Sequence, residues 1–186
     1  MTGEGMRVIL GIDPGTNVMG YGVVCCKGNK LELKILDVLS LSSKMDHYAR
    51  LNEIFSTTLQ LIAQFKPAEL AVESQFYGKN VQSMLKLGRA QGVVIAAALH
   101  KGVSVSEYSP RRIKQSITGK GNASKQQVAA MLQHIFSMNS NSFPPDATDG
   151  LAVAVCHYLQ GSVSQNISAK NGSWKSFISQ NPDRVF

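Results

Sequence analysis

The apolar residues near the start of the chain recur with the spacing of β-strands. A continuous apolar run covers Val8–Ile12 and ends at Asp-Pro-Gly, which predicts a buried strand closed by a turn. Gly20–Cys26 and Leu31–Leu39 predict two further strands, and in the second of these the apolar residues alternate with Glu32 and Lys34. The chain is therefore expected to open with a three-stranded meander.

Beyond the meander, segments of helical periodicity alternate with short apolar strands. A capping box of Ser124 and Gln127 marks the start of one of these helices. Gly88 and Gly92 lie one turn apart on another, where they would let a second helix approach closely. The alternation predicts an α/β domain with a mixed sheet of about five strands flanked by helices. The helices are predicted over His47–Phe65, Val81–Lys101, Pro110–Ile117, Ser124–Phe136 and Asp146–Leu159, and the later strands over Leu70–Val72 and Val103–Tyr108.

The length of 186 residues corresponds to one compact domain, which we assign to residues 1–160. Residues 161–186 are rich in Ser, Asn and Lys and are expected to form a flexible polar tail. The longest apolar run, Val93–Leu99, is far shorter than the ~18 residues of a membrane span, and no secretory segment follows Met1. We therefore expect a cytoplasmic protein with no membrane partner, whose three cysteines are reduced core residues.

The net charge of +7 is concentrated in one part of the sequence. Between Lys79 and Lys125 nine basic residues face a single acidic one, Glu107. Such a one-sided basic block suits a surface that binds a polyphosphate, because each cation near a phosphate releases condensed counterions. The alternative is a solubilising face on two exposed helices. The block includes Lys79, Arg111, Arg112, Lys114, Lys120 and Lys125.

Carboxylates stand at positions where secondary structure alone does not require them. Asp13 and Glu73 come at the ends of apolar strands, while Asp146 and Asp149 lie three residues apart at the start of the last helix. Oxygen ligands without Cys or His favour Mg²⁺ or Mn²⁺. Two such ions can drive phosphodiester hydrolysis. Simpler interpretations stay open: Asp13 could serve the turn, and the helix N-terminus favours aspartate without any metal.

The same residues lie in a longer pattern that is specific to one family. The strings ILGIDPGTNVMGYGVV, AVESQFYGKNVQSMLKLGRAQG, SPRRIKQSITGKGNASKQQV and PPDATDGLAVAVCH closely resemble, in this order, the RuvC family of Holliday junction resolvases. The match spans roughly Val8–Leu159. The resemblance implies an RNase H-like fold, a homodimer, and Mg²⁺-dependent paired nicking of four-way junction DNA. It also implies a branch-migration helicase complex as a partner.

The resemblance also implies roles for individual residues. The family's catalytic carboxylates, which hold the two Mg²⁺ ions for which Mn²⁺ can substitute, fall on Asp13, Glu73, Asp146 and Asp149. Its base-contacting aromatic falls on Phe76, and basic residues for junction handling or catalysis fall on Lys114 and Lys125. We add Lys79, Arg111, Arg112 and Lys120 as DNA-binding candidates from the basic block.

Two other residues of the last helix lie outside the candidate metal-ligand set. Gly150 stands where the family pattern leads us to expect Ala, at a cost of up to ~1 kcal/mol in a helix. His157 lies ~12 Å along the helix from Asp149, too far to share its metal, and we interpret it as structural.

Three other functions compete with junction resolution. The Asp-x-Gly-Thr of Asp13–Thr16 also resembles the phosphate loop of actin, sugar-kinase and Hsp70 ATPases, but those proteins need a second domain for which 186 residues leave no room. A non-catalytic DNA-binding module would explain the basic block and leave the carboxylates idle. A related RNase H-like nuclease could act on other branched or RNA-containing substrates. Metal-dependent nicking separates enzyme from module, and substrate choice separates the nucleases.

Overall fold

The computed structural model of the chain describes residues 6–28, 30–75, 80–138 and 144–170. Its strands form one mixed sheet with the order β3-β2-β1-β4-β5. The first three strands are antiparallel neighbours, whereas β4 and β5 run parallel to β1. This confirms the predicted mixed sheet that begins with a meander. The strands are β1 (Arg7–Asp13), β2 (Val18–Lys27), β3 (Lys30–Ser40), β4 (Glu69–Glu73) and β5 (Ser104–Tyr108).

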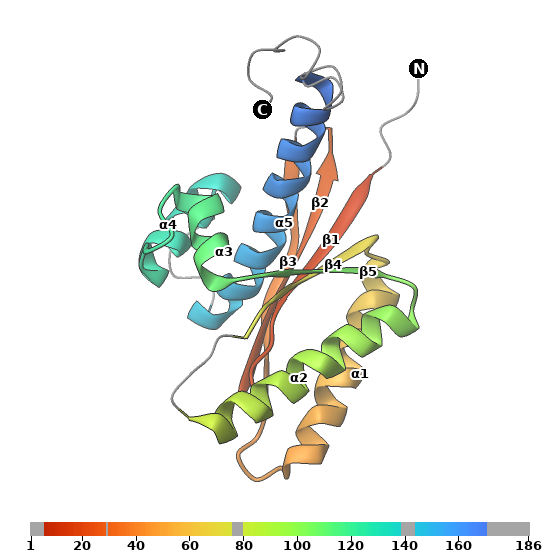
Figure 1. The fold of residues 1–186 in the computed structure, drawn as a ribbon. Helices are drawn as coiled ribbons and strands as arrows, with labels where there is room; N and C mark the ends of the chain where they lie inside the picture. Colours follow the sequence, from red (N-terminus) through yellow and green to blue (C-terminus); the bar gives the residue numbers. More distant parts are fainter. Residues whose placement is uncertain (1–5, 29, 76–79, 139–143, 171–186) are drawn as a thin grey trace, which may run out of the picture.

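The helices cover the two faces of the sheet unequally (Figure 1). On one face α5 packs against β2 and β1, with α3 and α4 beside it. On the other face α1 and α2 pack against each other. Among the described residues no helix has the length and apolar character needed to cross a membrane. The helices are α1 (His47–Phe65), α2 (Val81–His100), α3 (Pro110–Thr118), α4 (Lys125–Phe136) and α5 (Pro145–Lys170).

Alternate residues of the strands build a separate hydrophobic core on each face of the sheet. Ile9 and Val24 belong to the core under α5, whereas Leu10 and Val23 belong to the core under α1 and α2. This is the period of two that the pleat imposes on buried strands. Cys25, Cys26 and Cys156 are buried and free, as predicted.

Most helix boundaries follow the signals in the sequence. The first helix occupies the predicted range His47–Phe65, and the side chain of Asp46 caps it by accepting from the Ala49 N–H at 2.9 Å. The capping box of Ser124 and Gln127 is present at the start of α4. These local hydrogen bonds replace those that the first turn of a helix lacks, so they fix where a helix begins.

The predicted end of the last helix is wrong. We expected it to stop at Leu159, but α5 continues through Gly161 to Lys170. The polar composition beyond Leu159 suggested a loose tail. Ser, Asn and Gln each lower helix stability by only tenths of a kcal/mol, and even Gly by about 1 kcal/mol, so a long packed helix can extend through them.

Gly150 is required for the way α5 lies on the sheet. A Cβ atom on Gly150 would lie 2.5 Å from the Cα of Tyr21, and one on Gly20 would lie 2.0 Å from the carbonyl oxygen of Asp146. Both contacts are too short for any side chain. The expectation that Ala would be more comfortable than Gly150 is therefore wrong: the cost in helix propensity is outweighed by the close approach of helix to strand. That approach brings the first turns of α5 to the end of the sheet.

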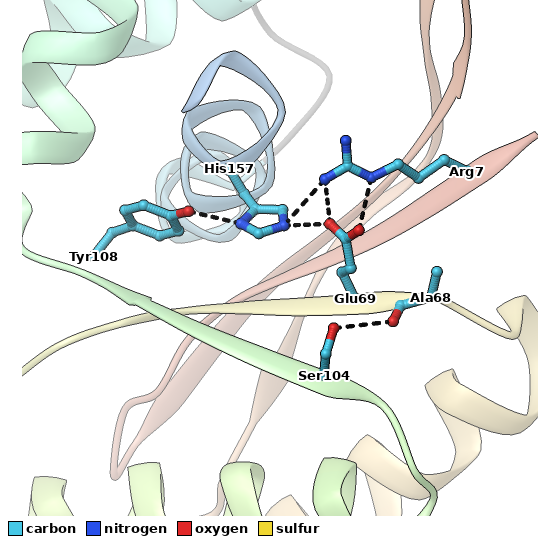
Figure 2. Close-up of polar contacts among 6 residues, drawn as sticks. All are labelled: Arg7, Ala68, Glu69, Ser104, Tyr108 and His157. Carbon is cyan, nitrogen blue, oxygen red and sulfur yellow. Dashed lines mark hydrogen bonds and ion pairs between the residues drawn. The ribbon is translucent and has the colours of Figure 1, made fainter. Parts of the chain in front are cut away.

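A charged cluster joins the middle of α5 to the sheet (Figure 2). Arg7 donates from Nε to the Glu69 carboxylate at 2.9 Å and also binds it through Nη2. His157 contacts the same carboxylate through Nε2 and the Tyr108 hydroxyl through Nδ1, the latter at 2.7 Å. His157 is thus held by structural partners, as the sequence predicted.

Candidate active site

Asp13 and Glu73 are the last residues of two neighbouring parallel strands. Ile12 pairs with Val72, so the carboxylates that follow them leave the same edge of the sheet side by side. Both side chains are half-buried. Strand ends of this kind are where ligand groups collect in α/β sheets.

The third and fourth carboxylates come from α5. Asp149 is half-buried, with 16% of its side chain exposed, whereas Asp146 in the first turn is exposed. Gly150, immediately after Asp149, is the residue that allows α5 to touch β2. The close packing of helix on sheet therefore sets the position of Asp149 over the ends of the strands.

A small cavity brings most of these residues together. Its volume is about 130 Å³. Three of the four predicted carboxylates and both predicted catalytic lysines line it, while Asp146 does not. The lining residues are Asp13, Glu73, Pro110, Ile113, Lys114, Lys125, Val128, Asp149 and Ala152.

The carboxylates in the cavity repel one another. Burial, followed by the charge of Asp149, raises the pKa of Asp13 to about 6, and Asp146 contributes in the same direction. Burial, Asp13 and Asp149 together raise the pKa of Glu73 to about 8. A group of acids that resists ionisation is poised to accept a positive partner.

Two lysines supply part of the missing positive charge. The Nζ of Lys125 donates to Oδ2 of Asp149 at 2.6 Å, and this hydrogen bond raises the pKa of Lys125. Lys125 lowers the pKa of both Asp13 and Glu73, and Lys114 lowers that of Glu73. The side chain of Lys125 is 68% exposed, so its ammonium group can leave Asp149 for an incoming anion.

The other basic candidates take different positions. Arg111 lines a broader hollow of about 790 Å³ that adjoins the carboxylate cavity and shares Lys114 with it. Arg112 instead binds Gln160 of α5, and Lys120 borders a hollow beside α4. Phe76 and Lys79 lie outside the described residues.

The donor set fits a hard divalent cation. The carboxylate cavity offers oxygen ligands without Cys or His. Among the described His, Cys, Asp and Glu residues, no three are gathered as a ready-made metal cage. Mg²⁺ is commonly held by one or two carboxylates together with water and substrate phosphate, and carboxylates line this cavity.

The turn between β1 and β2 is held from both sides, which the sequence pattern did not indicate. Gln75 donates from Nε2 to the carbonyl oxygen of Pro14 at 3.4 Å. Arg50 donates from Nη1 to the carbonyl oxygen of Thr16 at 3.1 Å and to Oδ1 of Asn17 at 2.9 Å. Both partners are remote in sequence, so no local motif could have revealed that they steady the loop after Asp13.

Comparison with known proteins places this site in a family. The family described as "Crossover junction endodeoxyribonuclease RuvC" matches residues 9–157, a range that includes all four carboxylates. The chain belongs to the RuvC family. It is 53% identical over 96% of its length to the RuvC of Cytophaga hutchinsonii, and 50% identical over 96% to that of Porphyromonas gingivalis. These alignments cover 88% and 97% of the two relatives.

A solved structure gives the same answer. RuvC of Thermus thermophilus in complex with a Holliday junction substrate superposes with a TM-score of 0.79 and 34% identity, over 85% of this chain and 96% of that one. The predicted RNase H-like fold with a mixed sheet is confirmed. Membership of the RuvC family makes the protein a nuclease and implies that it uses a divalent metal.

Proposed function

We propose that this protein resolves four-way DNA junctions during recombination and repair by paired, metal-dependent nicks in opposed strands. The observation that carries the proposal is the gathering of Asp13, Glu73 and Asp149 with two lysines around one cavity in a RuvC-family fold. An ATPase loop or an inert DNA-binding module would not need carboxylates that raise each other's pKa. The T. thermophilus relative was solved with a Holliday junction bound.

We assign the chemistry to the carboxylates and lysines of the cavity. Asp13, Glu73, Asp149 and, from its rim, Asp146 would hold two Mg²⁺ ions, and Mn²⁺ would substitute. When bound, such ions activate water and stabilise the leaving oxygen. Lys114 and Lys125 place positive charge at the scissile phosphate, where electrostatic stabilisation is a large part of phosphoryl-transfer catalysis.

The basic surface around the cavity would hold the junction. Arg111 extends the positive lining from Lys114 into the neighbouring hollow. Lys79, Arg112 and Lys120 would add phosphate contacts, and Phe76 would stack on a base at the crossover, a contact worth ~1–3 kcal/mol. A branch-migration helicase complex would deliver the junction, and the work would take place in the cytoplasm.

We assign pairing of two copies to α2. Val81, Leu85 and Leu99 are 63%, 52% and 61% exposed. At 100° per residue they fall on one stripe, and Gly88 and Gly92 lie on the same stripe with open space where a side chain would be. A homodimer through this stripe would present two active sites to the two opposed strands.

Sedimentation of Gly92→Arg tests this pairing, with Gln126→Arg at an exposed position of α4 as the control. Gly92→Arg should sediment as a monomer and the control as a dimer. A dimeric Gly92→Arg would place the interface elsewhere.

The function is tested with a labelled four-way junction and a linear duplex of the same sequence, each with Mg²⁺ or with EDTA. We expect symmetric nicks in the junction with Mg²⁺ alone and none in the duplex. Equal cleavage of both substrates would indicate a nuclease of other specificity, and binding without nicks would indicate a DNA-binding module.

A further inference from the structure

A second cavity opens at the same edge of the sheet, between the β1–β2 turn and the N-terminal ends of α1 and α2. Its volume is about 420 Å³. No acidic side chain belongs to its described lining. The polar lining consists of Thr16, Asn17, His47, Arg50, Ser83 and Lys86.

His47 and Arg50 form a half-buried part of the wall of this cavity. Nε2 of His47 and Nε of Arg50 are shielded from solvent and have no hydrogen-bond partner among the described residues. The Nη atoms of Arg50 are already engaged with Thr16, Asn17 and the carbonyl oxygen of Ser43. Arg50 therefore holds the turn through its Nη atoms and brings its positive charge to the wall of the cavity.

The chemistry of the lining selects an anion with several oxygens. Arg50 and Lys86 bring positive charge, and the hydroxyl groups of Thr16 and Ser83 and the amide of Asn17 can donate. Apolar surface in the cavity is limited to Met45 and Leu87. A cation would find no carboxylate here, and an apolar ligand would leave the donors unpaired.

We propose that this cavity binds a backbone phosphate of the junction, on the DNA strand that also crosses the carboxylate cavity. The inference rests on the proposed function and adds a contact on the opposite face of the sheet. Thr16 follows Asp13 by three residues, so their Cα atoms lie within about 11 Å, within the reach of one DNA backbone. Arg50 lines this cavity and steadies the turn that begins directly after Asp13 and includes Thr16.

Lys86→Gln tests the proposal without disturbing the fold, because the side chain is exposed. Lys27→Gln, at the far end of β2, is the matched control. The affinity of each protein for a four-way junction is measured in Ca²⁺ over a range of NaCl concentrations. Loss of one phosphate contact should make the log–log slope shallower by about one for Lys86→Gln and leave the Lys27→Gln slope at the wild-type value. Wild-type slope in Lys86→Gln would overturn the proposal.

A scan of single methylphosphonates along the junction strands identifies the phosphate. At one position the neutral linkage should weaken binding by the wild-type protein and have no further effect on Lys86→Gln. If the loss of affinity from the methylphosphonate adds to the loss from Lys86→Gln at every position, the assignment is overturned. If the wild-type protein fails to nick junctions in Mg²⁺, the proposed function fails; if it nicks while Lys86→Gln matches it in slope and scan, only this phosphate site fails.

Discussion

Two glutamates at opposite ends of β4 lie in contrasting electrostatic surroundings. Glu69 opens the strand and Glu73 closes it, four residues later and on the same face of the sheet. Burial alone would raise the pKa of both. At Glu69 the hydrogen bonds from Arg7 and His157 outweigh burial and hold the pKa below its usual value. At Glu73 the neighbours are Asp13 and Asp149, and the pKa rises to about 8.

Burial is the largest single influence on the pKa at both ends and is deeper at Glu73, and the partners decide whether the pKa finally rises or falls. Arg7 and His157 bind the Glu69 carboxylate, so side chains of the folded protein compensate the charge at this end of the strand (Figure 2). The carboxylates at the other end are left with too little positive charge. A metal ion could supply the positive charge that these carboxylates lack. Acids with perturbed pKa values cluster at functional sites.

The largest effect is expected from Asp13→Asn. The change removes a ligand charge, so nicking of a four-way junction should fall by about 10³-fold or more, while the basic surface still binds the junction. Gel-shift and nicking assays on the same preparation measure the two properties. Glu53→Gln, which alters an exposed carboxylate on α1, should behave as wild type. Nicking by Asp13→Asn at the wild-type rate would remove Asp13 from the catalytic set.

Glu69→Gln should lower stability and leave nicking activity intact, the opposite of the effect expected from Asp13→Asn. It leaves Arg7 and His157 without their anionic partner and should lower the free energy of unfolding by about 1–3 kcal/mol. Nicking per folded molecule should be unchanged. Urea denaturation with a matched nicking assay tests both, and Glu32→Gln, whose partner Lys34 is exposed, should leave stability unaltered. Loss of activity in folded Glu69→Gln would mean that the two ends of β4 are coupled.

The pH dependence of stability separates the two ends without DNA. Because the pKa values of Asp13 and Glu73 are raised to about 6 and about 8, the folded state binds more protons than the unfolded state over that range. Stability in EDTA should therefore fall as the pH rises from about 4.5 to about 8. The lowered pKa of Glu69 acts oppositely: its contribution is present above the unfolded pKa and is lost as the pH falls through the folded pKa.

Glu73→Gln tests whether the raised pKa of Glu73 causes this pH dependence of stability. Its free energy of unfolding in EDTA should equal that of wild type near pH 4.5 and exceed it increasingly up to pH 8. A constant difference over this range would show that Glu73 titrates normally.

The sequence predicted what depends on local pattern. Strand periodicity and capping residues placed the five strands and gave the exact limits of α1. The motifs placed three carboxylates and two lysines that the fold brings to one cavity. Contacts remote in sequence were not predictable in this way. The need for Gly150 depends on how closely α5 approaches β2, and the cluster around Glu69 joins residues far apart in the chain.

The smallest effect, and the most discriminating, is expected from Asp149→Asn in metal-free buffer. Asp149 is the fifth residue of α5 and lies beyond the first turn, where the helix dipole acts. A capping role therefore predicts little change in stability when its charge is removed. Its bond joins a half-buried carboxylate to the exposed ammonium group of Lys125 and is worth about 1 kcal/mol. Removing its charge also relieves the repulsion on Asp13 and Glu73, which opposes that loss.

In the Lys125→Gln background there is no salt bridge to lose, and only the relief of repulsion remains. Asp149→Asn should therefore raise the melting temperature in that background and change it little in wild type. Added Mg²⁺ should stabilise wild type more than Asp149→Asn. Equal Mg²⁺ responses, together with a lower melting temperature in both backgrounds, would return Asp149 to a purely structural role.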